Sequence, residues 1–220
     1  MTFHIITLFP GIFVSVFTES IIKRAVAKNL IKIKFINPRD FAKDKYKTVD
    51  DKPYGGGAGM VMKVDTLVPA LESIKPKPYT ILLSASGKKF NQQKAKILAK
   101  KKNVALICGH YEGVDARLEK YVDETLSIGD FVTTGGEIPA IAIIDAVTRL
   151  LPGAITKGSL EVESFDENLL EAPQYTRPEN FRGQKVPKVL LSGNHKEIEK
   201  WRQQESVKRT KKHRPDLLKN

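Results

Sequence analysis

The first 150 residues of this 220-residue chain alternate short apolar runs with amphipathic segments. The amphipathic segments carry apolar residues at mostly helical spacing. Strands that alternate with helices predict an α/β domain with a mostly parallel sheet. The expected strands are 3–8, 31–36, 79–84, 104–108 and 125–128, and the expected helices are 12–28, 65–74, 91–101 and 113–121.

Three turns that contain glycine follow expected strands directly: SASGKK, CGHYEG and SIGD. Ligands of open α/β sheets bind outside the carboxyl ends of the strands. The three turns are therefore expected to line one crevice. For CGHYEGVDAR alone, a simple strand-to-helix turn and a ligand site explain the spacing equally well. A carboxylate such as Glu112 or Asp115 suits the start of a helix in either case.

The glycine-rich stretch YGGGAGM at 54–60 resembles a phosphate-binding loop only superficially, because Gly-Met-Val stands where the Walker pattern requires Gly-Lys-Ser/Thr. A flexible loop is the favoured interpretation. The segment 137–151 is apolar on nearly every side, with Pro139 in its first turn. Such a helix has to be covered all round, which makes a symmetric dimer plausible.

The chain carries a formal charge of +12, and residues 171–220 contribute +7 of it. A basic excess in one segment is typical of a protein that binds a polyanion such as nucleic acid, although a solvated surface explains the charge about equally well. The weak periodicity and many acidic residues of segment 155–170 predict a mobile linker. A capping-box-like start at Asn194 and Glu197 predicts a helix within a small C-terminal domain at 171–220.

The lone cysteine, Cys108, lies in the apolar run NVALICG, which predicts a packed strand residue rather than a nucleophile. No run of apolar residues is long enough to span a bilayer, and the start MTFHIITLFPGIF lacks the features of a secretory signal. We therefore expect a cytoplasmic protein that does not bind a membrane.

Several motifs together resemble the bacterial tRNA (guanine-N1-)-methyltransferase family of the knotted SPOUT class. They run in order along essentially the whole chain: LFPGIF, NPRDF, TVDDKPYGGGAGM, CGHYEGVDAR, SIGDFVTTGGEIPA, LLEAPQYTRPENF and PKVLLSGNHKEIEKWR. The resemblance implies an α/β fold whose mostly parallel sheet ends in a trefoil knot. It also implies a knotted S-adenosylmethionine-binding catalytic domain at 1–154 and a basic helical tRNA-binding domain at 171–220.

In this family the knot wraps the adenosine of S-adenosyl-L-methionine, so glycines let backbone groups reach the adenine. Two positions depart from the family pattern, because Leu82 stands for a tyrosine and Ala85 for a proline. The resemblance assigns these residues to the cofactor: Leu82, Leu83, Ser84, Gly109, Tyr111, Glu112, Gly113, Ser127, Ile128, Gly129, Gly135, Gly136 and Pro139.

Methylation of guanine N1 requires a general base, because N1 carries a proton at neutral pH. The resemblance implies a catalytic aspartate in an Asp-Ser-Phe motif, and this chain has Glu163 there, in VESF, with Asp166 as a second candidate. The family's arginine, which stabilises negative charge on O6, matches Arg149.

The implied substrate is the guanosine just 3′ of the anticodon, at position 37 of tRNA. The implied enzyme is a homodimer with active sites at the subunit interface. A magnesium requirement is also implied, but no metal ligand is assigned. Residues assigned to tRNA are Asp50, Arg177, Asn194, His195, Arg202 and Arg209. A knotted methyltransferase acting on ribosomal RNA and a non-enzymatic RNA-binding protein are the alternatives.

Overall fold

The computed structural model describes residues 1–156, 164–165 and 168–218. The chain forms two compact units, Met1–Thr156 and Lys157–Asn220. Most of the predicted linker lies outside the described residues, so its mobility stays a prediction. Within the described residues, no helix combines the length and the apolar character needed to cross a membrane.

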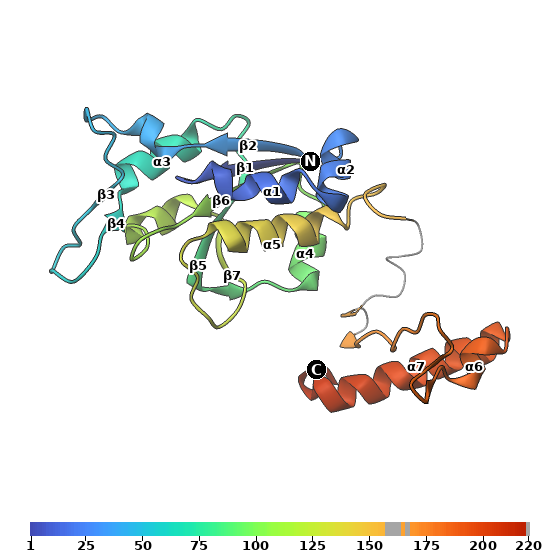
Figure 1. Ribbon diagram of the computed structural model, residues 1–220. Helices are drawn as coiled ribbons and strands as arrows, with labels where there is room; N and C mark the ends of the chain where they lie inside the picture. Colours follow the sequence, from blue (N-terminus) through green and yellow to red (C-terminus); the bar gives the residue numbers. More distant parts are fainter. Residues whose placement is uncertain (157–163, 166–167, 219–220) are drawn as a thin grey trace. The chain divides into compact units, whose positions relative to one another are not determined.

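The first unit is built on a five-stranded sheet in the order β2-β1-β6-β5-β7, with all neighbouring strands parallel (Figure 1). This confirms the predicted α/β class. Its strands are β1 (Thr2–Ile6), β2 (Lys32–Ile36), β5 (Tyr79–Lys89), β6 (Asn103–Cys108) and β7 (Glu124–Ser127). A separate antiparallel pair consists of β3 (Asp50–Asp51) and β4 (Val61–Met62).

Five α-helices and three 3-10 segments complete this unit. The helices are α1 (Val14–Phe17), α2 (Ser20–Ala27), α3 (Val64–Glu72), α4 (Gln92–Leu98) and α5 (Glu137–Thr148). The 3-10 segments are Pro10–Phe13, Pro38–Phe41 and Ala116–Tyr121.

The central strands of the sheet are buried on both faces, and neighbouring residues of one strand enter different cores. On β5, Leu83 packs in a cluster with residues of α2, α4 and α5, whereas Leu82 packs in a cluster with residues of α3. Side chains of a strand point alternately to its two faces, which accounts for this division. It also explains why the expected strands read as continuous apolar runs.

Two expected helices differ from the structure. The segment 12–28 is interrupted at Thr18 and Glu19, and Ser20 has a φ of 50°. The segment 113–121 is not an α-helix, because Val114 pairs with Met62 in an isolated bridge and only Ala116–Tyr121 coils, as a 3-10 helix. A contact between residues distant in sequence thus competes successfully with the local helical pattern.

The described part of the second unit contains a short hairpin and two α-helices. These elements are β8 (Asn180–Phe181), β9 (Gln184–Lys185), α6 (Lys188–Leu191) and α7 (His195–His213), followed by a 3-10 turn at Pro215–Leu218. The Glu197 backbone N–H donates to the Asn194 side-chain oxygen at 3.4 Å, which confirms the predicted helix start.

Candidate functional site

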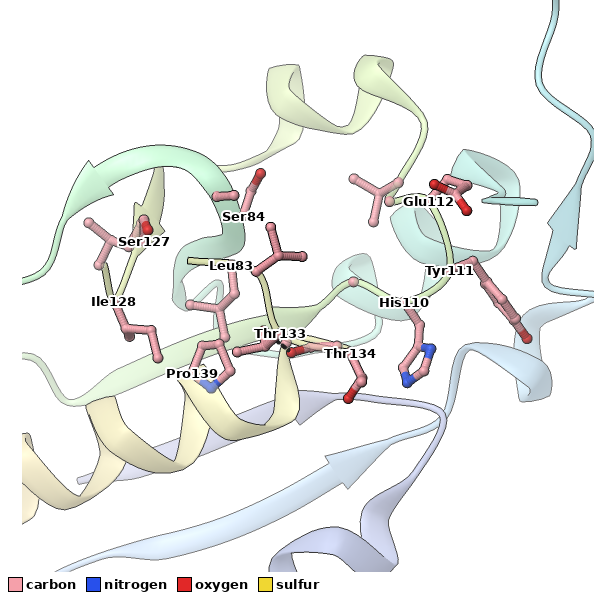
Figure 2. Close-up of a pocket in the computed structure, with 18 of the residues that line it drawn as sticks. Leu83, Ser84, His110, Tyr111, Glu112, Ser127, Ile128, Thr133, Thr134 and Pro139 are labelled. Atoms are coloured by element: carbon pink, nitrogen blue, oxygen red, sulfur yellow. Dashed lines mark hydrogen bonds between the residues drawn. The ribbon is translucent and has the colours of Figure 1, made fainter. Parts of the chain in front are cut away.

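A pocket of about 210 Å³ lies at the carboxyl ends of β5, β6 and β7 (Figure 2). Its walls come from 83–85, 109–114 and 126–128, and from the segment that leads into α5. Parts of all three predicted segments line this pocket, but SASGKK is not a turn, because residues 84–89 belong to β5. The volume is below the range of about 300–1,000 Å³ for pockets that enclose most of a drug-sized ligand. A larger ligand would therefore extend beyond the space enclosed here.

Eleven of the thirteen residues assigned to the cofactor line this pocket: Leu83, Ser84, Gly109, Tyr111, Glu112, Gly113, Ser127, Ile128, Gly135, Gly136 and Pro139. The two others do not. The Leu82 side chain points into the second core, where it is 2% exposed. Gly129 lies next to the pocket, with its backbone N–H and carbonyl both bonded to the Ser127 hydroxyl.

Close backbone approach explains the glycines before α5. A Cβ on Gly136 would lie 2.6 Å from the Cα of Cys108. The Gly136 N–H donates to the Gly109 carbonyl at 2.8 Å, so the two walls are joined by main chain. A Cβ on Gly135 would lie 2.4 Å from Oε2 of Glu137 and 2.7 Å from the His110 ring. Any side chain at either position would push the walls apart.

A buried carboxylate fixes the start of α5. Glu137 is 2% exposed, and its Oε1 accepts a hydrogen bond from the Thr7 hydroxyl at 2.7 Å. The Thr7 oxygen also accepts the backbone N–H of Phe9 at 3.0 Å. A negative charge is favourable in the first turn of a helix. The loop after β1 and the helix that forms part of the pocket are thereby held together.

The glycine-rich loop 54–60 connects β3 and β4. It packs against Glu112, which lines the pocket. The Glu112 N–H donates to the Met60 carbonyl at 3.0 Å, and the Met62 N–H donates to the Gly113 carbonyl at 2.9 Å. Gly59 has a φ of +80°, and a Cβ there would lie 2.4 Å from Cγ of Glu112. The loop therefore helps to position Glu112, a role that composition alone did not indicate.

Sequence reasoning did not select several residues that line the pocket, although they lie inside quoted motifs. Among them, His110 packs its ring 4.7 Å from Phe9 and 5.5 Å from Tyr111. The Thr133 hydroxyl donates to the Gly135 carbonyl at 2.8 Å (Figure 2). The sequence alone does not mark a single histidine or a loop threonine as a pocket residue, because their neighbours become known only from the folded structure. The other unassigned lining residues are Ala85, Val114, Leu126, Phe131, Val132 and Thr134.

Two ionisable groups near this wall have shifted pKa values. Arg117 donates to Asp115 through Nε at 2.9 Å and Nη2 at 2.6 Å, and this pairing holds the pKa of the Asp115 carboxyl below its usual range. Burial raises the pKa of the Cys108 thiol well above its usual value, and the charge of Glu137 adds to the effect. Cys108 is 1% exposed on β6, as predicted for a packed strand residue.

The residues assigned to catalysis do not meet at this pocket within the described part of the chain. Arg149 is exposed and follows the last residue of α5, whereas the pocket lies at the first turn of that helix. At 1.5 Å per residue, about 20 Å separates Arg149 from Gly136. Glu163 and Asp166 lie outside the described residues.

Five of the six residues assigned to tRNA are exposed in the second unit: Arg177, Asn194, His195, Arg202 and Arg209. Asp50 belongs to the first unit, on β3 opposite Met62. In the second unit, Leu170 is anchored to α7 because its backbone N–H donates to the Thr210 hydroxyl at 2.8 Å. A hollow beside this segment contains Arg209, and an adjoining one contains Lys208, Arg209, Lys212 and His213.

The comparisons with known proteins agree with one another. The model of the family described as tRNA (Guanine-1)-methyltransferase TrmD matches residues 1–220. A protein of Carboxydothermus hydrogenoformans is 54% identical over 100% of this chain and 88% of its own length. A protein of Trichodesmium erythraeum is 52% identical over 100% of this chain and 99% of its own length.

A third relative, from Endomicrobium trichonymphae, is 50% identical and matched over the full length of both chains. All three relatives bear the name tRNA (guanine-N(1)-)-methyltransferase. A family model that matches every residue, with relatives at this level of identity, shows where the chain belongs. This chain is a member of the tRNA (guanine-1)-methyltransferase family.

Proposed function

We propose that this enzyme transfers a methyl group from S-adenosyl-L-methionine to N1 of the guanosine at position 37 of tRNA, just 3′ of the anticodon. Family membership over the whole chain supplies the reaction class, tRNA guanine-N1 methylation. The use of S-adenosyl-L-methionine is supported by one structural observation, the pocket lined by backbone beside β5, β6 and β7. It brings together eleven residues that the family pattern assigns to the cofactor.

The pocket fits the adenosine part of this cofactor in its chemistry. Gly109, Gly135 and Gly136 bring main chain to its wall, where an adenine edge needs hydrogen-bonding groups. The Gly136 N–H and the carbonyls of Gly109, Gly135 and Gly136 take part in hydrogen bonds within the wall. Leu83, Ile128 and Pro139 supply apolar surface for the ring. When bound, the cofactor supplies an electrophilic methyl group on a sulfonium. The residues of the pocket hold and orient it, and the glycines permit the close approach of the backbone.

The chain must also remove a proton, because the N1 lone pair of guanine is not available while N1 is protonated. A positioned carboxylate takes that proton, and negative charge develops on O6 of the base. The freed N1 lone pair would then accept the methyl group that the bound cofactor supplies, the bonding electrons of the leaving group would stay on its sulfur, and the proton would stay on the carboxylate. A guanidinium near O6 stabilises the charge on the base.

Glu163 is the proposed general base, and Asp166 is the second candidate. Replacement of the true base by its amide removes the proton acceptor and keeps the side-chain size. We expect Glu163→Gln to lower the rate of methyl transfer by about 10²- to 10⁴-fold. Asp166→Asn is the matched control and should retain most of the rate. The opposite pattern in single-turnover assays would assign the base to Asp166.

Arg149 is proposed to act in the active site of a second subunit. Its separation of about 20 Å from the pocket along α5 is too large for one arginine side chain to bridge. The apolar surface near that helix supports a dimer. Ile138 is 52% exposed and Ile12 is 42% exposed, and α5 contacts the 3-10 segment that contains Ile12. A second copy of the chain would cover this surface and bring an arginine toward the pocket.

Mixed dimers test this arrangement. One parent is Arg149→Ala, and the other is Gly109→Leu, which places a side chain at the pocket wall where a Cβ would meet Val114 at 3.3 Å. A site that takes its pocket from one subunit and its arginine from the other is intact once in each mixed dimer. We expect activity from the mixture although both parents are inactive. A mixture as inactive as its parents would place Arg149 and the pocket of one subunit in the same site.

The basic surface of the second unit is proposed to bind the tRNA backbone. Arg209, Lys208 and Lys212 lie around the hollows beside α7, and Arg202 is exposed on the same helix. Phosphate contacts of this kind make binding depend strongly on salt, while the target base is read on its exposed Watson–Crick edge.

Magnesium has no assigned step in this account. Among the described residues, no group of three or more His, Cys, Asp or Glu side chains is placed to hold a metal ion.

The proposed trefoil knot rests on family membership over the whole chain. Knots are otherwise rare in protein folds. Glycine allows a close main-chain contact where β5 and β7 pair with a register shift, because a Cβ on Gly87 would lie 2.5 Å from the carbonyl carbon of Leu126.

The substrate is tested with labelled S-adenosylmethionine and two RNAs, an unmodified tRNA mixture and ribosomal RNA, followed by nucleoside analysis. We expect 1-methylguanosine in the tRNA alone. Product in ribosomal RNA alone would support the alternative knotted methyltransferase, and failure to bind the cofactor would support a non-enzymatic RNA-binding protein.

A further inference from the structure

The amino-terminal edge of the sheet lies opposite the pocket, and positive charges gather along it. All five strands are parallel, so their first residues share one edge. The loops that lead into β6, β5 and β7 contribute six exposed lysines to that edge. We name these the lysine edge: Lys75, Lys77, Lys100, Lys101, Lys102 and Lys120.

The contacts of the chain place these lysines next to one another. Strands β6, β5 and β7 are consecutive neighbours in the sheet. Lys101 extends its ammonium group over the ring of Tyr79, 4.4 Å from the ring centroid, and so reaches from the start of β6 to the start of β5. Lys75, Lys77 and Lys120 line one cavity of about 300 Å³ between the loops before β5 and β7.

The positive charge continues across the rest of the edge. The amino group of Met1 precedes β1 and donates to the Leu30 carbonyl at 2.9 Å, and exposed Lys32 is the first residue of β2. Four of the five strands thus begin within two residues of a cation, whereas β7 begins with Glu124, which is paired with Lys94. With strands about 4.8 Å apart, the five positions span about 19 Å.

The lysine edge is not neutralised by its own neighbours. Within the described residues, none of its six lysines takes part in a salt bridge. Three exposed acids, Glu72, Glu119 and Asp123, lie beside them. Asp123 is already engaged, because its Oδ2 accepts the Thr80 backbone N–H at 2.7 Å. Six lysines against three acids leave a positive excess.

We propose that the lysine edge binds the phosphate backbone of tRNA, at a part of the molecule away from the nucleotides that enter the pocket. The lysine edge spans the starts of β6, β5 and β7, about 10 Å with strands about 4.8 Å apart. A nucleic acid strand presents a phosphate about every 3.4 Å of helix axis, so this row faces on the order of three phosphates. Lysine binds phosphate as a point charge and does not read the base sequence. The inference rests on the proposed function only in naming tRNA as the polyanion.

The test measures tRNA affinity, and it does not require catalysis. We compare the wild type with Lys75→Gln/Lys77→Gln/Lys120→Gln, using a tRNA transcript with adenosine at position 37, which the proposed function predicts is not methylated. The matched control is Lys23→Gln/Arg24→Gln/Lys34→Gln, which removes three charges from exposed residues of α2 and β2. The dissociation constant is measured at several salt concentrations, and cofactor binding reports on correct folding.

The proposal predicts that the lysine-edge variant binds tRNA at least tenfold more weakly near 0.1 M salt. The slope of log affinity against log salt should become about 3 units less steep, because each of the three lost phosphate contacts removes close to 1 unit. The control should stay within about threefold of the wild type by the same measure. If the triple variant does not fold, Lys77→Gln and Lys120→Gln should each reduce the slope by about 1.

Two results would overturn the proposal: wild-type affinity and slope in the lysine-edge variant, or an equal loss in both triple variants, which would indicate a general effect of net charge. The methylation assay separates this proposal from the proposed function. A wild type that makes no 1-methylguanosine, while the lysine-edge variant still loses tRNA affinity, would remove the enzyme function and leave the lysine edge as an RNA-binding surface.

Discussion

The hydroxyl of Thr7 donates a hydrogen bond of 2.7 Å to the carboxylate of Glu137, although 130 residues separate them along the chain. Thr7 follows the first strand of the sheet, and Glu137 opens the helix that forms part of the pocket. Both side chains are almost fully buried. The contact therefore fixes the entrance of α5 relative to the sheet.

Loss of the Thr7 hydroxyl should destabilise the protein and weaken cofactor binding. Thr7→Val keeps the shape but leaves the buried Glu137 carboxylate without this donor, at a cost of about 1.5–3 kcal/mol. Thr7→Ser retains the hydroxyl and should lose much less. Urea unfolding and cofactor titration provide the two measurements. Equal stability of the valine and serine variants would show that the hydrogen bond contributes little.

Gly59 and Gly56 offer a matched pair for the role of the glycine-rich loop. Both have a left-handed backbone, with φ of +80° and +79°. A Cβ on Gly59 would collide with Glu112, whereas a Cβ on Gly56 would meet nothing within 4 Å. Alanine at either position therefore causes similar backbone strain, but only Gly59→Ala also displaces the Glu112 side chain. We expect Gly59→Ala to weaken cofactor binding clearly more than Gly56→Ala. Equal effects would exclude the positioning of Glu112 by Gly59.

Cys108 should be unreactive in the folded enzyme. Burial raises the pKa of its thiol well above the usual value, so the thiolate that reacts with electrophiles is almost absent near neutral pH. A disulfide reagent at pH 8 should label it only after denaturation. Rapid stoichiometric labelling of the native protein would contradict its burial on β6.

His4 should make the enzyme less stable in mild acid. Burial and the nearby Lys34 lower the pKa of His4 in the folded state, so the unfolded chain takes up the proton first as the pH falls. The free energy of unfolding should then decline below pH about 6.5, by at most about 1.4 kcal/mol per pH unit. His4→Gln cannot titrate and should show a flatter pH profile. Parallel profiles for the two proteins would rule out this contribution.

The sheet was predictable from the sequence because its central strands β1 and β6, and the first half of β5, are buried and read as continuous apolar runs. All five expected strands occur, and the pocket is lined by the middle of β5 and by residues that follow β6 and β7. The end of β5 was not predictable. It continues to Lys89 after a register shift, and Gly87 lies directly against the backbone of Leu126.

The missed features depend on partners that are distant in sequence. Val114 pairs with Met62 instead of starting a helix, and β3 and β4 are two residues each, too short to leave a periodic signal. The role of Glu137 in holding Thr7 was invisible for the same reason. The pocket residues were named through motifs of the family, while spacing alone left a ligand site and a simple turn equally open for CGHYEGVDAR.

Methyl transfer to two tRNA transcripts that differ only at position 37 tests the central claim most directly. One transcript carries guanosine there and the other adenosine, each with labelled S-adenosylmethionine and nucleoside analysis of the product. The account predicts 1-methylguanosine in the guanosine transcript and no label in the adenosine transcript. Equal labelling of the two transcripts, or a product other than 1-methylguanosine, would contradict it.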